Sequence, residues 1–316
     1  MKTLLVVLAL CGATAQAQPA KWPVKPVRII VPLSPGGSVD IIARMLASHL
    51  TERLGQQCVV DNRPGAGSTL GAGMVARANA DGYTLLMMSP AFAGSAALYK
   101  LPYDPVKDIT PVAMAAAGSM FLAVHPSIKA VNIKAFLDLA RAQPGALRYG
   151  SGGIGSSTHL AAELLRQMTK TEMLHVPYKG IGAALVDLIG GQIQFYIAPG
   201  AALLPHVNTG KLRLLGITTL QRSPEFPDLP AIHETVPGYN ASFWYGLGTP
   251  QGTPRQVVDR LSQEVAAIVK LSDVQKRLQG DDLKAAHAGP EAFAKMIRDD
   301  IEMYARVVKT ANIKME

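Results

Sequence analysis

Residues suited to binding a small ligand gather in three glycine-rich loops, each lying between an expected strand and an expected helix. The loops cover residues 32–40, 62–69 and 149–159. Adjacent glycines let the backbone approach a ligand closely, and the free N–H groups at a helix start favour an anion. These loops therefore predict binding of a carboxylate or a phosphate. In the first loop a plain turn, with Asp40 facing the helix dipole, fits the pattern equally well.

The third loop carries the richest set of polar groups. Ser156, Ser157 and Thr158 precede His159 at the expected start of a helix. Hydroxyls and backbone amides placed there form an anion cradle, in which one of the three hydroxyls can act as the N-cap. His159 is then either a hydrogen-bond donor to the anion or, in a weaker alternative, a base for Ser156 in a hydrolase.

The same loop contains a literal G-x-G-x-x-G at Gly150, Gly152 and Gly155. A dinucleotide site needs a long apolar strand before that motif and an acidic residue about 20 residues after it. Here the preceding strand is short, and Glu172 lies in a polar connector. The sequence therefore predicts no dinucleotide and no other cofactor.

Motifs for catalysis and for metal binding are missing from the sequence. It has no G-x-S-x-G, no H-E-x-x-H, no Walker A motif and no C-x-x-C, and its seven histidines lack metal-ligand spacing. We therefore expect no enzyme, no catalytic residue and no metal site. In the second loop, Arg63 suits either a ligand carboxylate or an ion pair with Asp61 or Asp81.

Composition and the first residues predict an exported protein. Lys2, an apolar run over residues 4–10 and a small-x-small site at residues 15–17 indicate a signal peptide over residues 1–17. Cleavage leaves Cys58 without a disulfide partner. The net charge of +8 comes from scattered basic residues, so we expect no nucleic-acid surface. No apolar run after residue 20 is long enough to span a membrane, and we predict a periplasmic location.

Hydrophobic periodicity predicts an α/β fold with largely parallel, doubly wound sheets. In the first half we expect strands at 27–33, 58–61 and 84–88 and helices at 37–54 and 69–78. In the second half we expect strands at 121–124, 194–198 and 212–217 and helices at 134–142, 157–168 and 183–189. A capping box at Thr253 and a proline at Pro290 predict the starts of two further helices. Ligands of such folds bind beyond the carboxyl ends of the strands.

Ordered motifs from Trp22 to Val308 make the sequence resemble the solute-binding receptors of tripartite tricarboxylate transporters, often called Bug receptors. The motifs are Trp22-Pro23, Pro35-Gly36-Gly37, Asn62-Arg63-Pro64-Gly65-Ala66-Gly67, Asp81-Gly82-Tyr83, Leu101-Pro102-Tyr103-Asp104-Pro105, Tyr149-Gly150-Ser151, His175-Val176-Pro177-Tyr178-Lys179-Gly180, Gly190-Gly191-Gln192 and Gly252-Thr253-Pro254. Where relatives usually carry Phe-Pro-Pro-Gly-Gly, this chain has Leu33-Ser34-Pro35-Gly36-Gly37. The stretch over residues 87–94 is variable in the family.

The resemblance implies a type II periplasmic binding protein, a two-lobe Venus flytrap with the ligand in the cleft between the lobes. Lobe 1 would comprise residues 18–122 and 250–316, and lobe 2 residues 123–249. The implied ligand contacts are Leu33, Ser34, Pro35, Gly36, Gly37, Ser38 and Asp40 from lobe 1 and Gly152, Gly153, Gly155, Ser156, Ser157, Thr158 and His159 from lobe 2. Residues that would flank the ligand are Ser68, Thr69, Ser89, Ala91, Phe92, Ala198 and Pro199.

The resemblance also implies a carboxylate ligand, a membrane permease as partner and a monomeric receptor. Leu33, Phe92 and Phe243 suit a flat apolar body, so an aromatic carboxylate is the favoured expectation, with aliphatic di- and tricarboxylates left open. A periplasmic sensor that serves a signalling partner is the alternative from another class.

Overall fold

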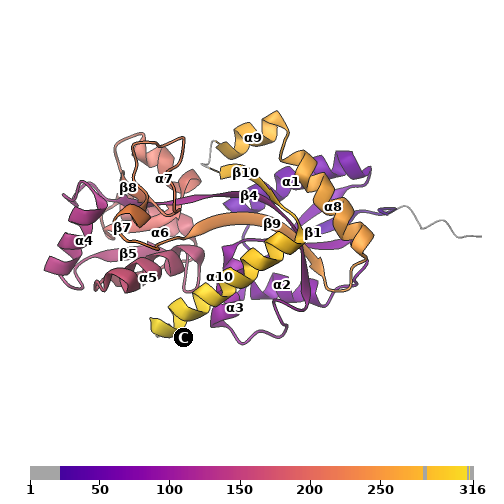
Figure 1. Ribbon diagram of the computed structural model, residues 1–316, viewed down its shortest axis with the longest axis horizontal. Helices are drawn as coiled ribbons and strands as arrows, with labels where there is room; N and C mark the ends of the chain where they lie inside the picture. Colours follow the sequence, from indigo (N-terminus) through magenta and orange to yellow (C-terminus); the bar gives the residue numbers. More distant parts are fainter. Residues whose placement is uncertain (1–21, 280–282, 312, 314–316) are drawn as a thin grey trace, which may run out of the picture.

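The computed structural model describes residues 22–279, 283–311 and 313. The predicted signal peptide, residues 1–17, therefore lies outside the described residues. Figure 1 shows two α/β halves side by side, joined by long strands and crossed by a helix from the end of the chain. Within the described ranges, no helix has both the length and the apolar character needed to span a membrane.

The first sheet combines a parallel part, which the sequence predicted, with an antiparallel part. Its parallel strands are β1 (Val27–Val31), β2 (Cys58–Asn62) and β3 (Thr84–Met88), and its antiparallel strands are β4 (Ile109–Val124), β9 (Ser242–Pro250) and β10 (Leu283–Ala288). The strand order is β2-β1-β3-β9-β4, with β10 also paired to β4. Ile29 and Ile30 of β1 belong to separate core clusters and are almost fully buried. A strand buried on both faces reads as an apolar run, as Ile29, Ile30 and Val31 of β1 do.

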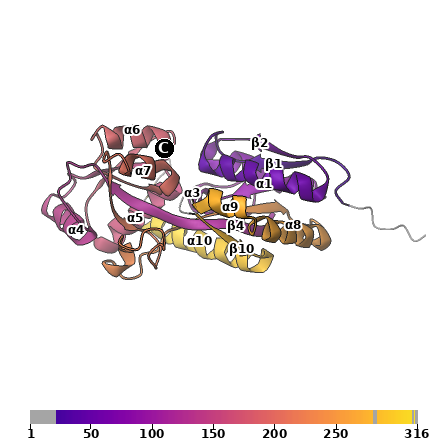
Figure 2. The ribbon, with the colours of Figure 1, turned by 90° about the horizontal axis from the view of Figure 1, so that it is seen from above.

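Helices cover both faces of this sheet. The cluster around Ile29 includes residues of α1 (Ser38–Leu54) and α8 (Arg255–Ile268). The cluster around Ile30 includes residues of α2 (Thr69–Ala76), α3 (Pro90–Leu98) and α10 (Pro290–Thr310). The short helix α9 (Ser272–Gln279) packs on β10. Figure 2 shows α8 and α10 running along the first half on the side away from β1 and β2.

The second sheet has the same design, with parallel strands at its outer side and antiparallel strands beside the first sheet. β6 (Leu174–Pro177), β5 (Arg148–Ser151) and β7 (Phe195–Pro199) are parallel, while β7 and β8 (Arg213–Ile217) both run antiparallel to β4. Its helices are α4 (Ile133–Ala142), α5 (Ser157–Thr169), α6 (Ile181–Ile189) and α7 (Gly200–Val207). Phe195 packs in the cluster that includes α4 and α5, and Tyr196 in the cluster that includes α6 and α7.

The chain passes between the two sheets within β4. Residues 109–119 of β4 pair with β9 in the first sheet, and residues 120–124 pair with β7 in the second sheet. β9 begins at Ser242, directly opposite Ser119. The sheets therefore change over at Ser119 and Ser242, whereas the predicted lobe boundaries were 122 and 250. The division into lobes itself stays a prediction.

Three differences from the predicted elements have physical explanations. The capping box at Thr253 is wrong, because Pro254 is the N-cap of α8 and the Thr253 hydroxyl donates to the Pro250 carbonyl at 2.8 Å. Helix α3 was not predicted, because its segment PAFAGSAAL has no polar face from which a period could be read. The length of β4 was missed as well, since small residues such as Gly118 and Ser119 interrupt its apolar pattern.

Candidate ligand-binding site

The parallel strands of both sheets end where the chain crosses between them. Pro199, the last residue of β7, pairs with Met120 beside the crossing, and Met88, the last residue of β3, pairs with Gly246 of β9. Because β1 and β5 are parallel to β3 and β7 respectively, the loops that follow all four strands lie at this junction. These are the loops in which the sequence placed the ligand contacts.

The first-half loop, residues 33–38, is mostly exposed, and the buried side chain of Asp40 holds it in place. Asp40 is 4% exposed, and its Oδ2 accepts the Gly36 amide at 3.0 Å and the Arg44 Nε at 3.0 Å. Its Oδ1 accepts the Asn62 Nδ2 at 2.9 Å. Burial raises the pKa of Asp40, but these hydrogen bonds and the charge of Arg44 outweigh burial and hold the pKa below its ordinary value. Asp40 thus shapes the loop, with both carboxylate oxygens occupied by protein donors.

Free donors remain in this loop. Among the described residues, the amides of Ser38 and Val39 at the start of α1 donate no hydrogen bond within the protein, and the hydroxyls of Ser34 and Ser38 have no protein partner. The first-turn amides of a helix point outward from its N-terminus. They are therefore available to a ligand at this end of α1.

The starts of α2 and α3 lie next to each other, and α2 also lies next to the end of β1. Ser68 Oγ lies 3.4 Å from the Ala91 carbonyl, which joins the two helix starts. A Cβ on Gly71 would come within 2.8 Å of the Pro32 Cβ, so only glycine lets α2 approach the end of β1 this closely. Thr69 and Ser89 are 9% and 3% exposed, and their hydroxyls have no hydrogen-bond partner among the described side chains and backbone.

In the second-half loop, residues 151–158, several backbone amides donate hydrogen bonds that hold the loop in shape. The Gly152 amide donates to Thr158 Oγ1 at 2.9 Å, the Gly153 amide to Ser151 Oγ at 3.1 Å and the Gly155 amide to His159 Nδ1 at 3.1 Å. Ser156 is the N-cap of α5, as expected for one of the three hydroxyls, and its Oγ accepts the His159 amide at 3.3 Å. Thr158 Oγ1 also lies 3.0 Å from Ser156 Oγ.

What remains free in this loop is a compact group of donors at the start of α5. The amides of Ser157 and Thr158 and the hydroxyl of Ser157 make no hydrogen bond to the rest of the described protein. The first turn of α5 contains no acidic residue, in contrast to that of α1, which contains Asp40. The start of α5 thus keeps its partial positive charge available to an anion.

The two halves touch directly at this site. A Cβ on Gly94 of α3 would lie 2.7 Å from the Gly155 carbonyl oxygen, and a Cβ on Gly155 would lie 2.2 Å from Leu98 Cδ1. Glycine at both positions lets α3 pack against the second-half loop. Ala198 and Pro199, at the end of β7, are buried.

The aromatic side chains proposed for the cleft lie in the cores instead. Phe92 is 1% exposed in the cluster that includes Trp244, and Phe243 is 4% exposed and packs edge-on against Tyr245 with ring centroids 5.0 Å apart. Only Leu33 of the three is partly exposed. Two of the three side chains that favoured an aromatic ligand therefore offer no ring face to the loops.

The residues suggested as a hydrolase pair are not joined as nucleophile and base. Ser156 Oγ accepts the backbone amide of His159, while the His159 ring accepts the amide of Gly155. Burial, followed by the charge of Arg166, lowers the pKa of His159 to about 4. Arg63 pairs with Asp61 at 3.0 Å, which is one of its two predicted ion pairs. The described residues contain no cluster of three or more potential metal ligands.

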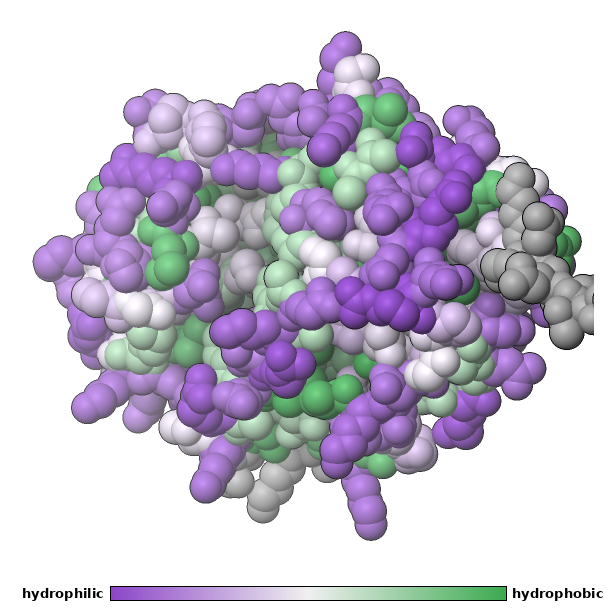
Figure 3. Space-filling model, turned by 45° about the vertical axis from the view of Figure 1, so that its right-hand side comes forward, coloured by the Kyte–Doolittle hydropathy of each residue, from purple (hydrophilic) through white to green (hydrophobic). Residues whose placement is uncertain are grey.

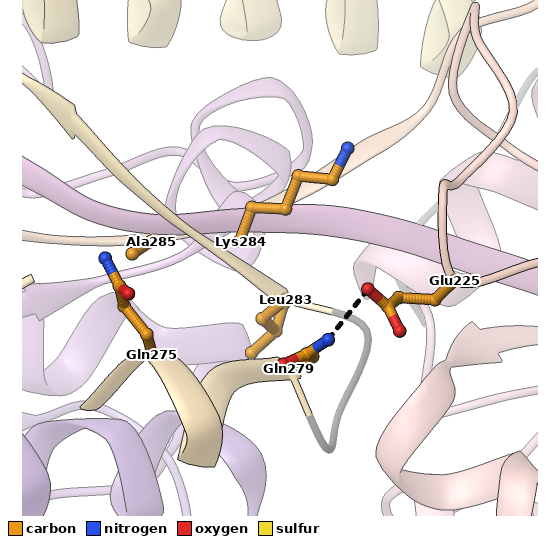
Figure 4. A pocket seen from close by; sticks show the side chains of 6 residues that line it. All are labelled: Glu225, Gln275, Gln279, Leu283, Lys284 and Ala285. Carbon is orange, nitrogen blue, oxygen red and sulfur yellow. Dashed lines mark hydrogen bonds between the residues drawn. The ribbon is translucent and has the colours of Figure 1, made fainter. Parts of the chain in front are cut away.

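A separate cavity of about 240 Å³ lies between α9, β10 and a second-half segment. Its lining residues are Glu225, Gln275, Gln279, Leu283, Lys284 and Ala285 (Figure 4). Gln279 Nε2 donates to Glu225 Oε1 at 2.8 Å across it. No residue of the three glycine-rich loops lines this cavity. Figure 3 shows a face that is largely hydrophilic, with paler and more hydrophobic residues towards its middle.

These features define a class: a periplasmic-binding-protein fold of two α/β halves, with glycine-rich loops at their junction. The model of one family, described as "Tripartite tricarboxylate transporter family receptor", matches residues 42–313. The chain belongs to this family of periplasmic solute-binding receptors, which are not enzymes. The resemblance seen in the sequence is thereby confirmed.

Three relatives illustrate the match. Protein BugT of Bordetella pertussis is 33% identical over 315 residues, covering 98% of this chain and 97% of the relative. The structure "R. palustris Rpa4515 with adipate" is 34% identical, with a TM-score of 0.85, and the match covers 93% of this chain and 99% of that chain. MatC (Rpa3494) from Rhodopseudomonas palustris with bound malate is 30% identical, with a TM-score of 0.81 and coverage of 91% and 100%.

Proposed function

We propose that this protein captures a small carboxylate between its two halves and delivers it to the permease of a tripartite tricarboxylate transporter. The observation that carries the proposal is the group of free donors at the start of α5, where the amides of Ser157 and Thr158 and the Ser157 hydroxyl have no protein partner and no acidic side chain competes. The free amides of Ser38 and Val39 offer a second set of donors from the first half.

The proposed ligand is an aliphatic dicarboxylate. Two donor groups on opposite halves suit a molecule with two polar ends, and the structural relatives contain adipate and malate. The aromatic carboxylate favoured from the sequence loses support because Phe92 and Phe243 are buried in the cores. It becomes the second arm of the binding test.

The proposed contacts divide the predicted site residues into two groups. Direct contacts come from residues whose donors are free, namely Ser34, Ser38, Thr69, Ser89, Ser157 and Thr158, the last through its amide. The others shape the loops or bring the halves together, as Asp40 does for Gly36 and Gly155 does for α3.

Ligand binding would favour a closed arrangement, because a ligand that bridges both halves binds that arrangement more tightly than an open one. The hinge would lie where β4 passes between the sheets and β9 begins, at Ser119 and Ser242. A closed monomer would then present a surface formed by both halves to the permease.

A thermal-shift panel of the purified protein tests the ligand class. It should contain adipate, malate, terephthalate and the uncharged diamide of adipate. A ligand present at about 100 times its dissociation constant adds about 2.7 kcal/mol of stability. We expect a shift with an aliphatic dicarboxylate and none with the diamide. Uptake of the ligand that gives a shift is then measured in a strain that lacks the receptor gene and expresses the transporter independently. Uptake is lost if the protein is a transport receptor and stays intact if it is a sensor.

A further inference from the structure

Two histidines lie beneath the second-half loop. His159 of α5 stacks on His175 of β6 with ring centroids 3.9 Å apart and planes at 14°, and His175 stacks in turn near Tyr149 at 5.0 Å. Tyr149 and His175 are register partners on β5 and β6, which puts their side chains on one face of the sheet. His159 is 3% exposed, so it lies behind the loop rather than on its outer surface.

Each histidine is connected to a different amide of the loop. His159 Nδ1 accepts the Gly155 amide directly at 3.1 Å. His175 Nε2 lies 2.6 Å from Ser151 Oγ, which accepts the Gly153 amide at 3.1 Å. Because Nδ1 of His159 is an acceptor, the proton of the neutral ring sits on Nε2. The stack thus orients two amides, that of Gly155 through the unprotonated Nδ1 of His159 and that of Gly153 through the Ser151 hydroxyl oxygen beside His175.

The first half holds its own loop in a comparable way. Gly36 and Gly155 both have a left-handed backbone, with φ of +80° and +78°, and each donates its amide to the side chain four residues later. In the first half that acceptor is the carboxylate of Asp40, and in the second it is the imidazole of His159. Because the acceptor in the second half is the neutral imidazole of His159, no negative charge lies next to the free donors of α5.

We infer that His159 is a positioning residue, which together with His175 fixes the second-half loop through Gly155 and so presents the donors of α5 to the ligand. The inference rests on the proposed function, because it assigns a role within that same site. His159 then contributes to affinity without touching the ligand.

The charges around the pair agree with a neutral stack. The groups that face it are Glu163 and Arg166 on α5 and Tyr149 on β5, whose hydroxyl donates to Glu163, while Arg166 pairs with Glu163 at 2.7 Å. Burial is the main cause that lowers the pKa of both rings, to about 4 for His159 and about 3 for His175. Two rings 3.9 Å apart also disfavour a charge on either one.

The test compares His159→Asn with His159→Leu. Asn places Oδ1 near the position of Nδ1 and can accept the Gly155 amide, whereas Leu has a similar branched shape and no acceptor. We expect calorimetry to give adipate affinity within about threefold of wild type for Asn, and a loss of about tenfold or more for Leu, as for a lost hydrogen bond of about 1.4 kcal/mol. Equal affinity of the two variants would overturn the inference.

Two readouts on the unliganded protein separate this inference from the proposed function. Amide hydrogen exchange at Gly155 should be slow in wild type and in the Asn variant and fast in the Leu variant. The amide shift of Gly155 should change with a midpoint near pH 4 in wild type and lack that midpoint in the Asn variant. If wild type binds no carboxylate, the proposed function fails. The hydrogen exchange and the pH dependence of the Gly155 amide then still decide whether His159 positions the loop.

Discussion

Gly94 of α3 and Gly155 of the second-half loop are in direct contact across the junction of the two halves, since a Cβ on Gly94 would lie only 2.7 Å from the Gly155 carbonyl oxygen. The same Cβ would lie 2.8 Å from Leu160 Cδ1. The loop that carries the proposed anion site is therefore also a contact surface between the halves.

Substituting Gly94 should weaken this contact. We expect Gly94→Ala to lower the free energy of unfolding by about 1–3 kcal/mol, as overpacking does. The added Cβ would clash with backbone atoms of Gly155, which cannot move without displacing the loop. Gly182→Ala in α6 is the matched control, since a Cβ there meets nothing within 4 Å and alanine favours a helix. Urea unfolding checks both variants. A Gly94→Ala protein as stable as the control would contradict the close contact.

Ser157 should contribute to ligand affinity and little to stability. Its hydroxyl has no protein partner, so Ser157→Ala should reduce dicarboxylate affinity about tenfold with an unchanged melting temperature. Adding Thr158→Ala should also cost stability, because Thr158 Oγ1 holds the Gly152 amide. Ser156→Ala is the contrasting variant, with a lost N-cap that costs about 1 kcal/mol of stability. Unchanged affinity in Ser157→Ala would rule out its hydroxyl as a ligand contact.

Asp40 should stabilise the fold in a pH-dependent way. Its pKa is lowered in the folded protein, so its contribution is present above the ordinary value of 3.8 and is lost as the pH falls below it. Asp40→Asn should therefore be less stable than wild type at pH 7, with the difference shrinking toward pH 3. Denaturant titrations of both proteins across this range measure the effect. A difference that stayed constant with pH would show that Asp40 acts through packing alone.

Asp300 should behave in the opposite sense. Burial raises its pKa to about 6, against the opposing hydrogen bond from Trp244 Nε1 at 2.7 Å. The folded state then holds a proton that the unfolded chain releases, so stability falls as the pH rises from about 4 to 7, by up to about 3 kcal/mol. Asp300→Asn keeps an acceptor for Trp244 and should lack this fall. Parallel pH dependence of the two proteins, measured by urea unfolding, would refute the assignment.

Much of the first half could be predicted from the sequence because its strands and helices alternate cleanly. Ile29, Ile30 and Val31 of β1 form an apolar run buried on both faces, and α1 has a regular apolar stripe that ends at Gly55 in a left-handed conformation. The antiparallel strand β9 was harder, because its residues from Phe243 onward are all buried and give no alternation. α3 was missed because its segment has no polar face.

The site could be predicted only as a set of loops. The glycines and hydroxyls of residues 150–158 mark a place for an anion, but the sequence does not show which amides the loop uses itself. That division depends on side-chain orientations that the sequence does not show, both in the local contact of Gly155 with His159 and in the contact of Ser151 with His175 on another strand. His175 had a visible signal, its place in a family motif beside Pro177, but no period or spacing linked it to the loop.

Calorimetric titration of the purified wild-type protein with adipate and with its uncharged diamide tests whether the free donors at the helix starts capture a dicarboxylate. We expect one molecule of adipate, or of a related aliphatic dicarboxylate from the thermal-shift panel, to bind each chain. The diamide should not bind measurably, because the starts of α1 and α5 favour anions. Equal binding of acid and diamide, or binding of neither across the aliphatic and aromatic series, would contradict this expectation.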